Sequence, residues 1–382
     1  MRNQQGAALL VLVMVIVTAA SFLLLKVSRP SVIERNKITA AALAQAKDAL
    51  IGDAAAYRDT HLDVGGFQDK VFGYLPCPDT DNDGSANPPC GGKDVTVVGR
   101  LPWKTLGLPP LRDSAGECLW YAVSGRFKNN PRTDTLNWDT AGQLIMNDAG
   151  GATLTSGVAA VIFSPHGVIG GQARTSAGIT ECGGNTTVAA YLDGGDPIYV
   201  GTAPAAGADT TLTVATVASI KSGANNDQGL WITPEEIFRP VKSRSDFSAD
   251  ISTLLTDLKI SLDAATPPLV TTFITASTAG CPVTDGPTDQ KKDYFRCNWS
   301  NNLKFAEGAG ITVNGVSCDA VLIFVGERAF GQARVTLAEQ SNNANYLESP
   351  NLGVFPGGGG YTGVTDFDPS VASSDIVRCI KP

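Results

Sequence analysis

The chain has 382 residues, which is enough for one large domain or two of ordinary size. Apolar residues make up 43% of it and charged residues 17%, so a sizeable core is expected and wholesale disorder is excluded. The formal net charge is −8, and a chain without a basic face cannot neutralise phosphates. We therefore expect no nucleic-acid partner.

The N-terminus carries a long apolar segment. Residues 7–25 read AALLVLVMVIVTAASFLLL, without a charge, a Gly or a Pro. This run is about as long as the ~20 residues that a helix needs to cross a bilayer, so it predicts a transmembrane helix. A cleaved secretory signal peptide, ending at the small residues Thr18-Ala19-Ala20, and a simple membrane anchor are the competing interpretations.

A second helix is predicted directly after this segment. Residues 31–57 are rich in Ala and other helix-permissive residues, and Leu43, Ala46, Leu50 and Ala54 form one apolar stripe. Pro30 lies between the two halves and is expected to kink the rod without ending it. Such an extension is not typical of a cleaved signal peptide.

The residues QQG followed by AALLVLVMV resemble the leader of type IV pilins and type II secretion pseudopilins. The resemblance implies that a prepilin peptidase cuts after Gly6 and that Ala7 is then N-methylated. It also implies that the apolar helix holds the subunit in the inner membrane and later packs against other pilins or pseudopilins. The resemblance covers roughly the first 60 residues.

The sequence departs from major pilins at one position. These proteins carry a Glu five residues after the cut, where this chain has Val11. In the family this Glu is thought to pair with the terminal amine of the subunit ahead. The K-type minor pseudopilin and PilX-type minor pilins also tend to lack it. The resemblance therefore implies a minor subunit that initiates a filament or lies at its tip.

Beyond the N-terminus, short apolar runs and caps predict further elements. Strands are expected at residues 119–124, 157–164 and 211–220 from their buried or β-branched character. A helix is expected to begin with Thr233 as its N-cap and Pro234 in its first turn. Residues 246–262 repeat apolar side chains at helical spacing and predict an amphipathic helix.

One pattern occurs twice. Residues 160–163 (AVIF) precede GQAR at 171–174, and residues 321–324 (VLIF) precede GQAR at 331–334. A coincidence of common residues is one interpretation. We favour a duplicated α/β unit, with a division near Thr266-Pro267-Pro268. Two copies are too few for a solenoid.

Residues 79–84 read DTDNDG, so the carboxylates of alternate residues can surround one cation. Hard oxygen ligands at this spacing suit Ca²⁺, and Gly84 permits the sharp turn that closes the loop. The twelfth position is Cys90 instead of Glu, so a bidentate ligand would come from elsewhere, with Asp94, Asp113 and Glu117 as candidates. A solvated acidic turn is the alternative. The predicted structural Ca²⁺ ligands are Asp79, Asp81, Asp83, the backbone carbonyl of Ser85, and Asn87 directly or through water.

Eight cysteines follow the apolar segment, and their count is even. No CxxC pair occurs and only two His are present, so a zinc cluster is poorly supported. Disulfides in an oxidising compartment are the better interpretation. The sequence cannot choose among the possible pairings. Pairing of neighbours would give Cys77–Cys90, Cys118–Cys182, Cys281–Cys297 and Cys318–Cys379.

Catalysis is not indicated. Ser164-Pro165-His166 places a hydroxyl near an imidazole, but no GxSxG elbow is present and adjacency in sequence rarely produces triad geometry. We therefore expect a structural protein and not an enzyme.

These observations predict an α+β, pilin-like fold, with a long N-terminal transmembrane helix on an antiparallel sheet and an enlarged, two-lobed, disulfide-bonded periplasmic domain. The expected parts are a leader (1–6), the helix (7–60, spanning at 7–25 and extending over 31–60), a domain with the Ca²⁺ loop (61–265) and a second lobe (266–382). The expected protein is a single-pass inner-membrane subunit of a pilus or pseudopilus. The alternatives are a calcium-stabilised tip adhesin and a secreted enzyme with an ordinary signal peptide.

Overall fold

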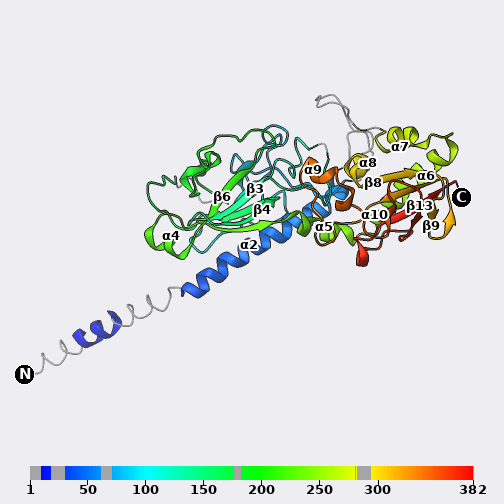
Figure 1. Cartoon of the computed structure of the whole chain (residues 1–382). Coiled ribbons are helices and arrows are strands. Elements are labelled where there is room, and N and C mark those ends of the chain that lie inside the picture. The colour runs from blue at the N-terminus through cyan, green and yellow to red at the C-terminus, as the bar shows by residue number, and fades with distance from the viewer. Residues whose placement is uncertain are drawn as a thin grey trace, which may run out of the picture.

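The computed structural model describes residues 10–18, 31–61, 71–133, 135–175, 182–279, 281 and 294–381. The molecule is elongated, and helix α2 (Val32–Ala55) runs out from between two lobes along the underside of the first (Figure 1). The side chain of Ser31 caps α2 by accepting the N–H of Glu34. Leu43, Ala46 and Leu50 are among its buried residues, which confirms the predicted apolar stripe.

The first lobe contains a four-stranded antiparallel sheet. Its order is β1 (Val97–Arg100), β2 (Trp120–Val123), β5 (Ala160–Ser164) and β7 (Gln228–Ile232). α2 packs on β5 and β7 on one face of this sheet. A second sheet, β4 (Thr153–Val158), β3 (Leu144–Asp148) and β6 (Thr210–Val214), contributes to the core cluster on the opposite face. Every residue of β2 and β5 is therefore buried.

The second lobe repeats this arrangement. Its antiparallel sheet has the order β13 (Ile376–Ile380), β11 (Ala320–Phe324) and β8 (Leu303–Glu307). Helix α6 (Ser245–Ala264) packs on β11 and β13, and α7 (Leu269–Ser277) packs on β8. A small sheet of β10 (Val316–Ser317), β9 (Thr312–Val313) and β12 (Gly360–Tyr361) lies on the other side of the core.

Short elements connect these layers. They include α5 (Pro234–Lys242), which begins with a capping box in which Thr233 and Glu236 satisfy each other's backbone N–H. The prediction of a helix start at Thr233 is confirmed. The others are α3 (Tyr57–Thr60), α4 (Val217–Ser222), α8 (Tyr294–Trp299), α9 (Leu337–Gln340), α10 (Asn351–Val354), η1 (Val188–Ala190), η2 (Pro197–Val200), η3 (Ser300–Asn302), η4 (Asn343–Asn345) and η5 (Pro369–Val371).

Two parts of the chain, called here the first and the second repeat, share one arrangement of strands and helix. The antiparallel strands β2–β5–β7 with helix α2 correspond in order to the antiparallel strands β8–β11–β13 with helix α6. In each repeat the central strand leads into GQAR and then into Tyr-Leu-Asp or Tyr-Leu-Glu, at residues 191–193 and 346–348. α6 lies before the predicted division at 265/266 but packs on the second sheet.

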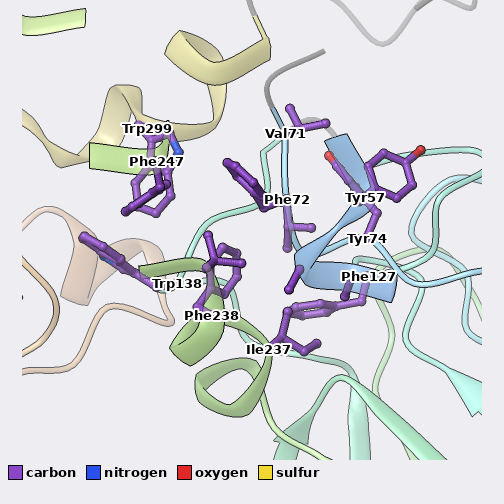
Figure 2. Packing of buried hydrophobic residues seen from close by; sticks show 14 of the residues in the cluster. Tyr57, Val71, Phe72, Tyr74, Phe127, Trp138, Ile237, Phe238, Phe247 and Trp299 are labelled. Carbon is purple, nitrogen blue, oxygen red and sulfur yellow. The ribbon is translucent and has the colours of Figure 1, made fainter. Parts of the chain in front are cut away.

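One aromatic cluster joins the two repeats. Phe247 of α6 lies among rings from both lobes, with ring centroids 6.0 Å from Trp138 and 5.3 Å from Trp299 (Figure 2). Phe72 and Phe238 lie in the same cluster, and buried residues of α2 belong to it as well. Because the cluster is continuous, the two repeats share one hydrophobic core at this junction.

The predicted pilin-like fold is wrong. The described strands divide among four small sheets, and two of these are each covered by their own helix. A sheet of a few short strands offers a face that one helix can cover. The chain therefore builds two layered units in place of one enlarged sheet. The strand predicted at 211–220 is also wrong in its second half, where the capping box of Thr216 and Ser219 starts α4.

The predicted single-pass inner-membrane protein is wrong as well. Among the described residues, no helix combines the length and the apolar composition needed to cross a bilayer. Residues 10–18 are helical and mostly apolar. α2 is long enough but charged, with Glu34, Lys37 and Asp48 among its residues. The rest of the predicted segment 7–25, and Pro30, lie outside the described residues.

All eight cysteines are paired as neighbours in sequence. Cys118–Cys182 and Cys318–Cys379 close long loops, with separations of 64 and 61 residues, and one lies in each repeat. Cross-links of this span reduce the entropy of the unfolded chain most, at about 4 kcal/mol each in the chain-entropy account. The predicted disulfide framework is confirmed, and it indicates an oxidising compartment.

Replacing Phe247 by Ala is expected to destabilise the whole chain by about 3–5 kcal/mol, because the side chain is fully buried between the repeats. Urea unfolding followed by tryptophan fluorescence measures this change. Phe330→Ala is the matched control, since Phe330 is fully exposed, and it should change stability by less than about 0.5 kcal/mol. Equal effects of the two substitutions would contradict a shared core.

Candidate functional site

The described N-terminal helix exposes apolar side chains. All apolar residues at positions 10–17 are more than half exposed, with Leu10 at 66% and Met14 at 67%. The first turns of α2 continue this character, because Val32 and Ile33 are 62% and 70% exposed where α2 extends beyond the first lobe (Figure 1). A run of exposed apolar helical residues is typical of a surface that packs against a partner. Gly6 and Ala7 lie outside the described residues.

The acidic loop brings three predicted ligands together. Oxygen atoms of Asp79, Asp81 and Asp83 lie within 4.8 Å of one another. Asp79 is fully buried, whereas Asp81 and Asp83 are more open to solvent. The aspartates alternate with Thr80 and Asn82, so a tight turn points all three carboxylates to one side. Three carboxylates at this spacing suit a hard cation.

Backbone groups hold the loop in this shape. Oδ1 of Asp79 accepts the N–H groups of Asp81 and Asn82 at 3.1 and 2.6 Å, and Oδ2 accepts that of Gly84 at 2.7 Å. These bonds lower the pKa of Asp79, but burial is the larger effect and raises it. Each carboxylate oxygen has two lone pairs. Oδ2 of Asp79 accepts one N–H and so retains a lone pair for a cation, as does the carboxylate of Asp83.

The remaining predicted ligands are placed less favourably. Asn87 uses its Oδ1 to accept the N–H of Thr80 at 2.7 Å and donates Nδ2–H to Asp81 Oδ2 at 3.1 Å. Ser85 donates its N–H to Asp83 Oδ1, a bond that contributes most to lowering the pKa of Asp83. The side chains of Asp113 and Glu117 are engaged with Ser164 and Arg174. The fit to Ca²⁺ thus rests on the three aspartates.

The rest of the first lobe fixes this loop. The Cys77–Cys90 disulfide closes its base. Gly84 has a φ of +88°, and a Cβ at this position would lie 2.5 Å from the ring of Trp103. Only glycine fits there without displacing the indole. The buried ammonium group of Lys128 donates to the carbonyls of Cys90, Gly92 and Val95, so the segment after the loop is also held.

Ser164 and His166 do not form a nucleophile and base. Ser164 Oγ donates to Asp113 Oδ2 at 2.8 Å, and the backbone N–H of His166 donates to the same oxygen at 2.9 Å. The hydroxyl of Ser164 is fully buried and bonded to a carboxylate without an imidazole between them. These contacts with Asp113 fasten the loop that follows β5.

The GQAR arginines form a clamp in each repeat. Arg174 donates Nε–H to the carbonyl of Ala190 at 3.1 Å and lies over the ring of Tyr191. Arg334 donates in the same way to the carbonyl of Asn345 and lies over the ring of Tyr346. The repeated letters could have revealed these residues from sequence, although their partners Tyr191 and Tyr346 could not be chosen that way.

Arg334 also connects the repeats. Its NH1 donates to Asp139 Oδ2 of the first lobe at 3.0 Å and to the carbonyl of Gly326 at 2.9 Å. Its side chain is completely buried. A buried guanidinium with a carboxylate and several carbonyl partners is held in one geometry.

Comparison with protein-family models, with characterised proteins and with solved structures gives no match to this chain.

Replacing Arg334 by Lys is expected to destabilise the protein by about 2–4 kcal/mol, because an ammonium group cannot reach Asp139, Gly326 and Asn345 together. Chemical unfolding at neutral pH measures the loss. Arg239→Lys is the control, since Arg239 is 67% exposed in a surface ion pair. If the buried and the exposed substitutions cost the same, Arg334 does not act as a clamp.

Proposed function

We propose that the chain is a minor structural subunit of a filament of the type IV pilus or type II secretion pseudopilus kind. It joins the filament through its N-terminal helix and presents the two repeats outside it. The observation that carries the proposal is the row of exposed apolar side chains at positions 10–17, together with Val32 and Ile33. Similar helices packed side by side would remove this surface from water, at about 25 cal/mol per Å².

The resemblance at the N-terminus supports the same proposal. The residues QQG before AALLVLVMV resemble a prepilin leader, so we propose Gly6/Ala7 as the processing site and a prepilin peptidase as a partner. Val11 in place of the Glu of major subunits favours a priming or tip position. The four disulfides suit a protein that works in an oxidising compartment.

We propose a structural role for the acidic loop. Ca²⁺ bound by Asp79, Asp81 and Asp83 would neutralise three neighbouring carboxylates and stiffen the turn above the Cys77–Cys90 bridge. The loop lies far from residues 10–18 along the chain, so its role is to support the exterior domain and not to drive assembly.

Val13→Lys is expected to prevent incorporation of the subunit into filaments. Val13 is 52% exposed, so the charge should leave the folded domain unchanged while it disrupts packing between helices. Sheared filament fractions from cells with the variant and with the unchanged chain are compared by quantitative mass spectrometry. The same spectra give the mature N-terminus, expected at N-methyl-Ala7.

Val200→Lys is the matched control, because Val200 is 73% exposed on the first lobe. It should enter filaments normally. Undiminished incorporation of Val13→Lys, or a mature chain that starts near Ser21, would remove the filament proposal.

Addition of Ca²⁺ to the chelator-treated protein is expected to raise its Tm by a few °C, because only the folded loop gathers three carboxylates. Asp81→Asn should abolish the increase. Asp148→Asn is the control, since Asp148 accepts N–H groups in a similar turn without neighbouring ligands. Identical melting curves with Ca²⁺ and with chelator would leave the loop as an ordinary acidic turn.

A further inference from the structure

A polar cavity lies where the two repeats meet. It has a volume of about 50 Å³, and every side chain that lines it carries a hydrogen-bonding group. Both lobes contribute to it, with Asn137, Asp139 and Thr140 from the first and Arg334 and Tyr346 from the second. One water molecule needs about 10–15 Å³, so the cavity has room for a small cluster of about three.

Asp139 directs an available acceptor to this cavity. Its side chain is only 10% exposed. Oδ2 accepts NH1–H of Arg334 at 3.0 Å and Nδ2–H of Asn302 at 3.1 Å. Oδ1 is also buried but accepts no hydrogen bond, and its nearest cation is Arg328, with Nε at 3.4 Å in an ion pair. Buried carboxylate oxygens are normally bonded to a donor, so Oδ1 is the oxygen that a ligand would meet.

The neighbouring buried groups are bonded to one another. Asn137 donates Nδ2–H to the carbonyl of Asn298 at 2.8 Å, and its Oδ1 accepts the N–H of Asp139 at 2.9 Å. Arg334 uses Nε and NH1 for its bonds to protein oxygens. These bonds hold the wall of the cavity in one shape, so a small ligand can bind without rearrangement of the protein.

Tyr346 lines the same cavity from the second repeat. The residue is 3% exposed, and its ring lies 3.7 Å from Nζ of Lys304 and 4.5 Å from Cζ of Arg334. Its hydroxyl forms no hydrogen bond with the part of the chain that the structure describes. A phenol hydroxyl can donate and accept, so it complements a ligand that also bonds to the carboxylate of Asp139.

The charges around the cavity favour a neutral ligand. Arg328 and Arg334 form ion pairs with Asp139. Burial, together with the charge of Arg334, lowers the pKa of Lys304 to about 8, while the charge of Asp139 opposes this shift. Three cations thus lie near one carboxylate, which disfavours a further cation. An anion would lie against the lone pairs of Asp139 Oδ1. Water donates to Oδ1 and accepts from Tyr346 without adding a charge.

We propose that this cavity is a binding site for a small cluster of ordered water molecules, one of which donates to Asp139 Oδ1 and links it to the hydroxyl of Tyr346. The cluster joins the first repeat to the second beside Arg334. Water-mediated hydrogen bonds are nearly as favourable as direct ones, so the cluster stabilises this junction. The proposal is independent of the proposed filament function, because it concerns only the folded repeats.

A crystal structure of the full chain tests the site directly. Electron density for a water molecule is expected within about 3.2 Å of Asp139 Oδ1. Crystals soaked in bromide should give no anomalous peak in the cavity. A bromide peak at this place, or a cavity without density beside Oδ1, would overturn the proposal.

Tyr346→Phe tests the same site in solution. The substitution removes only the hydroxyl, so the unfolding constant in urea is expected to increase by about two- to tenfold when a water-mediated bond is lost. A hydroxyl without any partner would give the opposite result, because its replacement by hydrogen leaves the unfolding constant unchanged or lowers it.

Tyr361→Phe is the matched reference variant, since Tyr361 is fully buried and its hydroxyl donates directly to the carbonyl of Gly357 at 2.8 Å. We expect the two variants to increase the unfolding constant by similar factors. An increase for Tyr361→Phe without one for Tyr346→Phe would show that no water links Tyr346 to Asp139.

Discussion

Phe247 lies at the centre of a set of aromatic rings drawn from both repeats, and the rest of the fold depends on their packing. Trp138 comes from the first lobe, Phe247 and Trp299 come from the second, and α2 contributes its buried stripe to the same core. Burial of aromatic side chains provides much of the free energy that orders a domain. Because this cluster is shared, the two repeats are expected to unfold together, and α2 is held in place by contacts with both its own sheet and the junction.

A few buried ion pairs lie within this apolar core. Arg58 forms a buried ion pair with Asp250 at 2.6 Å, which ties the helix after α2 to α6. Arg334 reaches from the second repeat to Asp139 of the first. Buried ion pairs add little net stability compared with apolar contacts, but breaking one is costly, so they restrict how the lobes pack.

The molecule has two layered units of similar arrangement, but only the helix of the first extends outward. α2 and α6 occupy equivalent places on their sheets, but α6 follows α5 after two residues, whereas α2 extends beyond the first lobe with exposed apolar side chains. Helix α6 is thus connected closely to its neighbours, whereas the first turns of α2 expose apolar side chains that a partner could contact. This difference places the proposed assembly surface in the first repeat alone.

Features that depend on residues close to one another along the chain could be predicted from the sequence. The stripe of α2, the cap at Thr233 and the turn at Gly84 follow from side-chain spacing and backbone preferences within a few residues. Two features could be seen only in the folded molecule: four small sheets form in place of one large sheet, and Asp139 of the first lobe meets Arg334 of the second. These outcomes depend on contacts between segments brought together by the path of the whole chain, and no local preference encodes which distant segment a buried carboxyl group will meet.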